Sequence, residues 1–335
     1  MTPQAVSDNS NMAAQDIAVQ ENELPGRPSL RGVLLRELIA AGVRLAGGDI
    51  ISFAKRYIKV SKPDWRPPHG WGVEKITMSG GASASYLTPK GCTRQDVAIL
   101  HLHGGGYTLG FLPVFKRFAF KLSRLGGQLP VLSLDYRVAP EHPYPAALED
   151  AMEAVRWLGR VKGIQTESVV VAGESCGAGM ALALAMRLRD EGLGCLRALV
   201  LMSPWSDITC GGSSYASRYK LDPFFGRKLP MPDDEDRTAI GKIYGGSSDL
   251  THPYLSPAFG DFSGLPPMLI HVGECEMLFD DSAIVYEKAK ACGVKAELHV
   301  WPGMFHVFQL ADGLIPEAHN SWREIGAYIR RVTKP

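Results

Sequence analysis

The strongest sign of chemistry in this sequence is a serine placed between two glycines. Gly173-Glu174-Ser175-Cys176-Gly177 follows the apolar run Val169–Ala172 and precedes a helical run that begins at Ala178. Between a strand and a helix, such glycines permit a tight turn that lifts the serine hydroxyl out of the sheet. The N-terminus of the following helix also points at developing negative charge. The pattern predicts a nucleophilic Ser175, and an ordinary strand–helix turn is the alternative.

A second motif, His103-Gly104-Gly105-Gly106, follows a short apolar run at Val97–Leu102. Three glycines let backbone N–H groups approach a ligand with no side chain in the way. In acyl transfer, such groups hold the oxyanion. A phosphate cradle is the rival functional interpretation, but neither Gly-Lys-Ser/Thr nor G-x-G-x-x-G is matched here. A flexible loop without function is the remaining alternative.

A serine nucleophile needs a histidine base, which comes last in the chain order serine, acid, histidine. His306 lies just after the last expected strand, where a loop can present it to Ser175. His271 and His299 lie within expected strands, which favours structural roles for them. The other two histidines beyond the serine lie in an insertion and in the final helix: His252 and His319.

The orienting acid is expected just after the strand at 268–272, because this places a carboxylate at the same edge of the sheet as the serine. Four residues satisfy this condition, and the residues alone leave the choice among them open: Glu274, Glu276, Asp280 and Asp281.

These residues need a scaffold, and the pattern of apolar runs predicts one. Short strands are expected at 73–80 and 82–88, and from residue 96 further strands at 97–101, 130–134, 168–172, 197–202, 268–272 and 296–301. Helices are expected between them, near 115–125, 146–160, 177–190, 280–292 and 317–332. Continuous apolar strands that alternate with helices indicate a mostly parallel sheet covered on both faces.

Residues 205–262 interrupt this alternation and are rich in Gly, Pro, Ser, Tyr and Asp. A segment this long is unlike a plain loop, so it predicts a helical insertion over one end of the sheet, together with an amphipathic helix or two within 32–60. Its aromatic side chains are candidates for a substrate pocket or for ordinary core: Trp205, Tyr215, Tyr219, Phe224, Phe225 and Tyr244. Tyr107, beside the three glycines, is the better candidate for a substrate wall.

Together these motifs resemble the hormone-sensitive-lipase-like family of α/β-hydrolase-fold carboxylesterases, from about residue 68 to 333. The match comprises His103–Gly106, Asp135–His142, Gly173–Gly177, Leu265–Pro267 and Pro302–His306. The resemblance implies an α/β-hydrolase fold, with a central mostly parallel sheet, flanking helices and a helical cap. The expected division is an N-terminal arm with cap helices at 1–67, a catalytic domain at 68–204 and 263–335, and a cap insertion at 205–262.

The resemblance also implies roles for individual residues. Ser175 would attack the ester carbonyl, and His306 would accept its proton. The family's acid segment, Gly-x-x-acid-x-Leu-x-Asp, begins at Gly273 and selects Glu276, where many relatives carry Asp; Asp280 is the fallback. The implied oxyanion hole is formed by the backbone N–H groups of three residues: Gly105, Gly106 and Cys176.

Two residues depart from the pattern that many relatives show, since Glu174 stands for Asp and Cys176 for Ala. Glu174 keeps the charge, and Cys176 offers its backbone N–H whatever its side chain. We expect the thiol of Cys176 to point away from Ser175 and not to act as a nucleophile. A separate charged group is interpreted as a buried ion network that holds the loop near the glycines: Asp135, Arg137 and Glu141.

Composition narrows the range of partners. The 335 residues contain 36 Lys+Arg and 35 Asp+Glu, a net charge of +1, so no large net charge attracts the protein to nucleic acid or an anionic membrane, and neither is expected as a partner. No run of 18 apolar residues and no secretory signal is found, so a cytoplasmic location is expected. Six dispersed cysteines without a CxxC pair predict free thiols, with neither a disulfide framework nor a zinc site. No metal, nucleotide or flavin motif appears, so no cofactor is expected.

The sequence therefore predicts a serine carboxylesterase, monomeric or homodimeric, that acts on short-to-medium acyl esters. One alternative keeps the machinery but changes the reaction to lactone hydrolysis, acyl transfer, elimination or cyclisation in specialised metabolism. Another is a non-catalytic ligand receptor on the same fold. The presence of His306 argues against a receptor, because some such receptors have lost this histidine.

Overall fold

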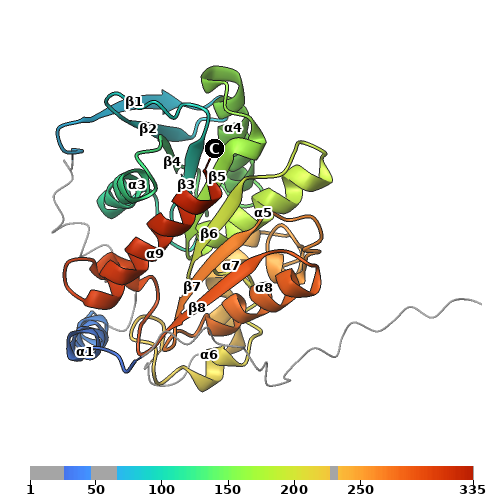
Figure 1. The fold of residues 1–335 in the computed structure, drawn as a ribbon. Helices are drawn as coiled ribbons and strands as arrows, with labels where there is room; N and C mark the ends of the chain where they lie inside the picture. Colours follow the sequence, from blue (N-terminus) through green and yellow to red (C-terminus); the bar gives the residue numbers. More distant parts are fainter. Residues whose placement is uncertain (1–25, 47–65, 227–232, 335) are drawn as a thin grey trace, which may run out of the picture.

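One eight-stranded sheet forms the centre of the molecule (Figure 1). The computed structural model describes residues 26–46, 66–226 and 233–334. In chain order the strands are β1 (Trp71–Thr77), β2 (Ser83–Pro89), β3 (Ala98–Leu102), β4 (Val131–Asp135), β5 (Val169–Glu174), β6 (Ala198–Met202), β7 (Met268–Gly273) and β8 (Ala296–Trp301). All eight predicted strands are confirmed, with ends that differ by a few residues.

The sheet order is β1-β2-β4-β3-β5-β6-β7-β8. β2 pairs antiparallel with β1 and β4, and the neighbouring strands from β4 to β8 are parallel. β3, β5, β6 and β7 are buried along their whole length. Their apolar runs are continuous because helices cover both faces of the sheet. The carboxyl ends of the parallel strands therefore meet at one edge, where the predicted site residues follow β5, β7 and β8.

Two helices cover one face of the sheet, α3 (Pro113–Leu125) and α9 (Pro316–Val332) (Figure 1). They share a core in which the ring of Phe118 meets that of Trp322 edge-on at 4.9 Å. The other face is covered by α4 (Ala146–Lys162), α5 (Cys176–Asp190) and α8 (Phe279–Ala291). These five helices confirm those predicted from the sequence. No helix of the described residues has both the length and the apolar character needed to cross a bilayer.

In its described part, the 205–262 segment holds helices and no strand, as the sequence predicts. These are α6 (Ser214–Ser217), α7 (Asp234–Gly245) and a short 3₁₀ turn. α7 lies against the glycine motif: a Cβ on Gly106 would come within 3.3 Å of Ile240, and the ring of Tyr244 stacks on Tyr107 at 3.7 Å. The insertion therefore packs directly on the loop that follows β3.

The N-terminal helix α1 (Leu30–Leu45) lies where the sequence predicts an amphipathic helix. It buries the small residues Gly32 and Ala40 together with Val43, whereas Leu34 and Leu38 are 62% and 59% exposed among the described residues. Leu35 and Ile39 are partly buried against a core that contains Met304 and Phe305. The helix is therefore amphipathic, as predicted, with Leu34 and Leu38 on its exposed side. The arm at 1–25 and the rest of the predicted helical region, 47–60, lie outside the described residues.

Candidate active site

Ser175 occupies a strained turn between β5 and α5. Its backbone has φ 56° and ψ −126°, a conformation that costs energy in a residue with a side chain. A Cβ on Gly173 would lie 2.4 Å from the carbonyl oxygen of Gly177, and a Cβ on Gly177 would lie 2.1 Å from that of Leu102. Only glycine fits at either position, so both glycines of the motif are required for the turn that presents the serine hydroxyl.

His306 reaches Ser175 from the loop after β8. Its Nε2 lies 2.9 Å from Oγ of Ser175, and the side chain is almost fully buried. The ring of Phe225, from the 205–262 insertion, packs edge-on against the imidazole at 5.0 Å. The loop that carries His306 packs closely against the end of β7, since a Cβ on Gly273 would lie 2.5 Å from the carbonyl carbon of Met304. The contact with Phe225 and the close packing of this loop together fix the position of the imidazole.

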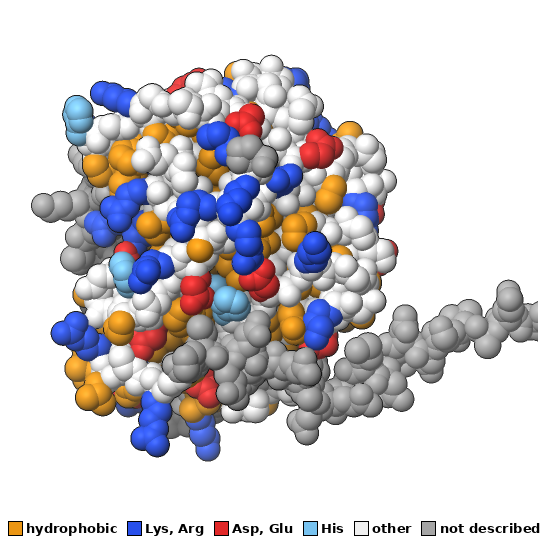
Figure 2. Space-filling view, viewed as in Figure 1, with side chains coloured by type: hydrophobic (Ala, Val, Ile, Leu, Met, Phe, Trp, Pro, Cys, Tyr) orange, Lys and Arg blue, Asp and Glu red, His pale blue; other side chains and the backbone are white. Residues whose placement is uncertain are grey.

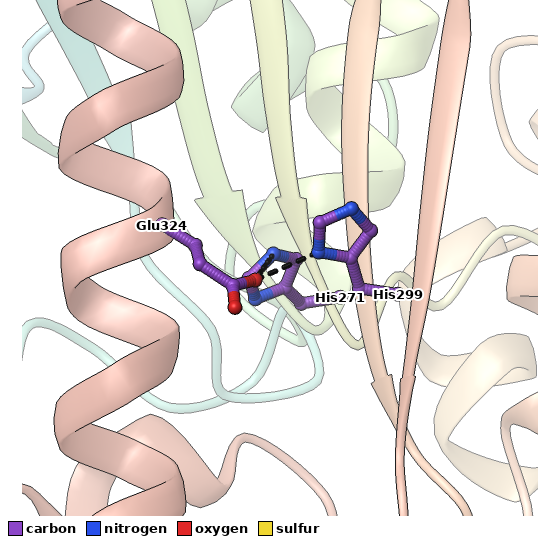
Figure 3. Close-up of side chains that lie close together, drawn as sticks. All are labelled: His271, His299 and Glu324. Carbon is purple, nitrogen blue, oxygen red and sulfur yellow. Dashed lines mark hydrogen bonds and ion pairs between the residues drawn. The ribbon is translucent and has the colours of Figure 1, made fainter. Parts of the chain in front are cut away.

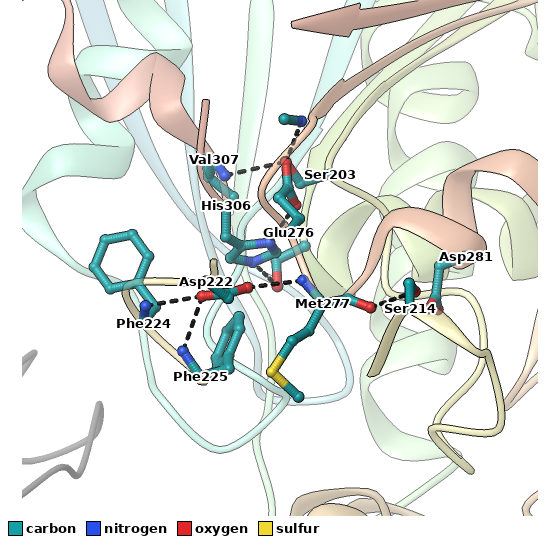
Figure 4. Close-up of polar contacts among 12 residues, drawn as sticks. Ser203, Ser214, Asp222, Phe224, Phe225, Glu276, Met277, Asp281, His306 and Val307 are labelled. Atoms are coloured by element: carbon teal, nitrogen blue, oxygen red, sulfur yellow. Dashed lines mark hydrogen bonds and ion pairs between the residues drawn. The ribbon is translucent and has the colours of Figure 1, made fainter. Parts of the chain in front are cut away.

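Glu276 completes the connection on the other side of the imidazole (Figure 4). Its Oε2 lies 2.9 Å from Nδ1 of His306, and its side chain is fully buried. The other oxygen, Oε1, accepts the hydroxyl of Ser203 at 2.8 Å and the N–H of Gly273. A carboxylate with these three donors favours the tautomer of His306 that carries its proton on Nδ1 and leaves Nε2 free to accept one.

The other three candidate acids lie elsewhere. Glu274 accepts the N–H of Gly303, and Asp280, the fallback, accepts the N–H of Ser214 at 2.9 Å. Asp281 accepts the N–H groups of Ser206 and Asp207 and the hydroxyl of Tyr215. None of the three has a hydrogen bond to His306 among the described residues, so the geometry separates four carboxylates that the residues alone left equivalent.

Ser203, which sequence reasoning missed, ties the acid to the base. It follows β6, donates to Glu276 and accepts the N–H of Val307 at 3.0 Å. One hydroxyl thus joins the loop that carries the acid to the loop that carries the histidine. A signal was available in the sequence, because Ser203 follows a parallel strand at the same sheet edge as Ser175.

The glycine motif lies beside Ser175, with φ of 123° at Gly105 and 61° at Gly106. A Cβ on Gly104 would lie 3.2 Å from the Cβ of Ser175. Among the described residues, the N–H groups of Gly105 and Cys176 have no hydrogen bond, whereas that of Gly106 faces the sulfur of Cys176. Two of the three predicted oxyanion donors are thus unengaged.

Glu174, the departure from the relatives' Asp, supports this glycine loop. One carboxylate oxygen accepts the N–H of Gly104 at 3.2 Å, and the other lies 3.1 Å from Nε2 of His101. His101 in turn contacts Ser133 on β4. His103 is also structural: its ring is stacked on Tyr136 at 4.1 Å, and burial lowers its pKa to about 3.

The thiol of Cys176 lies beneath the glycine loop. It accepts the N–H of Tyr107 at 3.3 Å and lies 3.6 Å from the hydroxyl of Tyr136. Burial raises the pKa of this thiol to about 11, so it is protonated at neutral pH. A protonated, buried thiol is a poor nucleophile, which agrees with the expectation that Cys176 contributes only its backbone.

Tyr107 is 2% exposed, with its ring parallel to that of Tyr244. This stacking fastens α7 to the glycine loop, and contact of Tyr107 with substrate stays a prediction. Four of the six aromatic residues of the insertion are buried core: Trp205, Tyr215, Tyr219 and Tyr244. Phe224 and Phe225 are half-buried, and Phe225 meets His306.

A fully buried carboxylate of the insertion, Asp222, joins these aromatic residues to the acid loop (Figure 4). Its Oδ1 accepts the N–H groups of Phe224 and Phe225, and its Oδ2 accepts the N–H of Met277 at 2.8 Å. Burial raises its pKa, and the charge of His306 acts in the opposite direction. Sequence reasoning missed this residue, because no periodicity marks a single carboxylate in an irregular segment.

The expected ion network of Asp135, Arg137 and Glu141 is wrong in its membership. Arg137 pairs with Asp150 of α4, donating through its guanidinium at 2.7 Å and through its backbone N–H at 2.9 Å. Glu141 is exposed, and Asp135 accepts the N–H of Phe111 instead. The correct partner lies one helix further along the chain, where spacing in the sequence gives no indication of it.

Comparison with known proteins agrees with this geometry. The profile of the α/β-hydrolase fold family matches residues 99–310. An acetyl-hydrolase of Streptomyces hygroscopicus is 37% identical over 77% of this chain and 83% of its own. The carboxylesterase/phospholipase LipF of Mycobacterium tuberculosis is 37% identical over 80% of this chain and 72% of its own.

A crystal structure of an esterase from the bacterial hormone-sensitive lipase family superposes with a TM-score of 0.77. The two are 30% identical, over 89% of this chain and 98% of that one. The chain therefore belongs to the hormone-sensitive-lipase-like family of the α/β-hydrolase fold and is a carboxylic ester hydrolase.

Proposed function

We propose that the protein hydrolyses short-to-medium acyl esters through an acyl-enzyme on Ser175. The observation that carries the proposal is the line of two 2.9 Å contacts from Ser175 through His306 to Glu276. A hydroxyl beside an accepting imidazole nitrogen, with a carboxylate behind it, is the arrangement that activates a serine for acyl transfer.

In acylation, Oγ of Ser175 attacks the ester carbonyl carbon while Nε2 of His306 takes the hydroxyl proton. Glu276 holds the Nδ1–H and stabilises the imidazolium that forms. The tetrahedral oxyanion accepts the N–H groups of Gly105 and Cys176, and the N–H of Gly106 joins them by turning from the sulfur of Cys176. Losing one such donor costs roughly 100- to 1000-fold in rate. His306 then protonates the leaving alcohol.

In deacylation, a water molecule replaces the alcohol and gives its proton to His306 as it attacks the acyl carbon. The alkoxide of Ser175 leaves and recovers the proton. Every proton therefore moves through Nε2 of His306, and no cofactor takes part. The substrate is a small-molecule ester.

The preference for shorter acyl chains is supported by the side chains that surround the serine. Phe225 packs on His306, and Ile240 lies against Gly106. Both belong to the 205–262 insertion and limit the room beside the nucleophile. One relative bears the name acetyl-hydrolase, which is consistent with a small acyl group.

The proposal is tested with p-nitrophenyl esters from acetate to laurate, using the wild type and Ser175→Ala side by side. We expect activity that falls with chain length and is lost in the variant, while circular dichroism shows an unchanged fold. Full activity in Ser175→Ala would reject Ser175 as nucleophile. Turnover of lactones but not of esters would favour the lactonase alternative, and tight binding without turnover would favour a receptor.

A further inference from the structure

A second group of side chains with metal-binding chemistry lies between the sheet and α9, outside the triad (Figure 3). His271 on β7 and His299 on β8 are direct neighbours in the parallel pairing, so their rings stack with centroids 5.0 Å apart. The side chain of Glu324 on α9 extends toward both imidazole rings (Figure 3). Its Oε2 lies 2.7 Å from Nδ1 of His299 and 3.6 Å from Nε2 of His271, and the three ligand atoms lie within 4.8 Å of one another.

One atom of this group lacks a partner. His271 is fully buried, and its Nε2 has no hydrogen bond among the described residues. If the ring proton is on Nδ1, two acceptors, Nε2 of His271 and the Glu324 carboxylate, face each other at 3.6 Å. If the proton is on Nε2, it points at an oxygen 3.6 Å away, which is too far for a hydrogen bond. A buried polar atom without a partner is costly, and a cation between these groups would remove that cost.

The other nitrogen of His271 is already oriented. Its Nδ1 lies 2.8 Å from Oγ of Ser321, and that oxygen also accepts the side-chain amide of Gln309 at 3.0 Å. With Nδ1 donating to Ser321, the lone pair of Nε2 points at Glu324. Metal-binding histidines characteristically donate their second ring N–H in this way, which fixes the tautomer and the ring orientation.

We propose that His271 Nε2, His299 Nδ1 and Glu324 Oε2 bind a divalent transition-metal ion, with Zn²⁺ as the ion to test. Two imidazole nitrogens and one carboxylate oxygen are a donor set that suits Zn²⁺. Bonds of roughly 2.0–2.1 Å in a tetrahedral site place ligand atoms about 3.3 Å apart. The separations of the two imidazole nitrogens from Oε2 of Glu324, 2.7 and 3.6 Å, lie on either side of that value. All three ligand atoms lie within 4.8 Å of one another, so binding requires a small movement of the side chains toward the ion.

Metal binding requires the ring proton of His299 to move and leaves one of the four coordination positions without a protein ligand. The proton that His299 shares with Glu324 passes from Nδ1 to Nε2 of the same ring, so the imidazole stays neutral. Glu324 is one-third exposed and lines a groove of about 850 Å³ beside α9, from which an ion and a fourth, water ligand can enter. Figure 2 shows this side of the molecule, where His side chains reach a surface that carries both acidic groups and Lys and Arg side chains.

The bound ion would join β7, β8 and α9, three elements of the C-terminal part of the chain. β7 continues from His271 to Gly273, whose N–H donates to Glu276, and the backbone carbonyl of His271 accepts the N–H of Ser203 at 2.7 Å. Among the described residues, however, the side chains of His271, His299 and Glu324 have no hydrogen bond to Ser175, His306 or Glu276. We therefore expect the metal to stabilise the fold and to leave the esterase reaction unchanged.

The test uses the full chain, treated with EDTA and dialysed, then titrated with Co²⁺ as a visible probe and with Zn²⁺ in competition. The wild type is expected to bind one equivalent of Co²⁺ with the intense visible bands of four-coordinate cobalt, which Zn²⁺ abolishes. Zn²⁺ is also expected to raise the midpoint of thermal unfolding. Only the weak bands of hydrated Co²⁺ in the wild type would overturn the proposal without any variant.

The variants are His299→Gln and Glu324→Gln, whose side chains are partly exposed and tolerate change better than His271. Each is expected to weaken Zn²⁺ binding at least tenfold and to lose the thermal shift, while ester hydrolysis stays as in the wild type. His319→Gln is the matched control, because His319 lies on the same helix, 3.7 Å from Asp312, and is 64% exposed. Unchanged binding in both variants, or equal loss in the control, would overturn the proposal.

Discussion

Ser203 donates its hydroxyl to Oε1 of Glu276 at 2.8 Å, while His306 takes the other oxygen of the same carboxylate. Both oxygens of the acid are thereby occupied, and its plane is fixed relative to the imidazole. Since Ser203 also accepts the N–H of Val307, a change in the acid loop is transmitted to the histidine loop. Ser203 is thus connected through Glu276 and His306 to Ser175, so the candidate triad and Ser203 form one chain of hydrogen bonds.

Removing the charge of the acid tests its identity. In Glu276→Gln, an NH2 group takes the place of one of the two carboxylate oxygens, both of which accept hydrogen bonds. An NH2 group that faces Nδ1 of His306 cannot accept its proton, so the wrong tautomer of the imidazole is favoured. We expect kcat to fall by roughly 10³- to 10⁴-fold. Asp280→Asn is the matched control, since Asp280 contacts Ser213 and Ser214 and not His306. This variant should lose no more than about twofold in kcat, which corresponds to the ~0.5 kcal/mol typical of peripheral changes. The reverse ranking of the two rates would move the acid to Asp280.

Ser203→Ala removes the hydroxyl that holds Glu276 and leaves the N–H of Val307 without its acceptor. A lost hydrogen bond to a charged group costs about 1.5–3 kcal/mol, so we expect kcat to fall roughly 10- to 100-fold with little change in KM. Ser206→Ala is the control, because its equally buried hydroxyl bonds to Asp281 and not to the triad. Equal losses in both variants would reduce Ser203 to a purely structural role.

Alkylation distinguishes the two neighbouring nucleophile candidates. The pKa of Cys176 is raised to about 11 by burial, so its thiol stays protonated and unreactive at roughly pH 8. Iodoacetamide should modify the exposed Cys195 and Cys292 without loss of esterase activity. Peptide mass mapping checks the sites. Inactivation that parallels labelling of Cys176 would contradict this prediction.

The buried His103 predicts how stability depends on pH. Burial lowers its pKa from 6.5 to about 3, so the fold favours the neutral ring. Its contribution to the free energy of unfolding is complete above pH 6.5 and is lost as the pH falls toward the folded pKa. In His103→Phe, the free energy of unfolding should therefore change less with pH than in the wild type. Urea unfolding at roughly pH 5 and pH 7 measures this difference. The control is His319→Phe, because His319 is exposed. The same pH dependence of the unfolding free energy in His103→Phe and in the wild type would contradict the prediction.

Strands, helices and the turn at Ser175 could be predicted because each is set by local patterns. A continuous apolar run, a helix of buried residues such as α5, and two glycines around a serine are visible over a few residues. The choice of Glu276 required the register of a family motif, because four carboxylates follow β7 and spacing treats them alike. Only the fold shows that three of them turn toward other donors.

What the sequence could not predict depends on long-range packing. Asp150 was missed as the partner of Arg137 because α4 brings it back to the loop. Asp222 was missed because its three N–H donors come from two separate segments. His271 and His299 look like ordinary strand residues, and only the pairing of β7 with β8 beneath α9 places them beside Glu324.

The most direct test of Ser175 as the nucleophile is covalent trapping with a p-nitrophenyl phosphonate, followed by peptide mass spectrometry. We predict one adduct per chain, on the peptide that contains Ser175, with Cys176 unmodified and with loss of activity in proportion to labelling. Ser175→Ala should take up no label, and His306→Ala should react far more slowly. An adduct on another residue, or inactivation without modification of Ser175, would contradict the proposed mechanism.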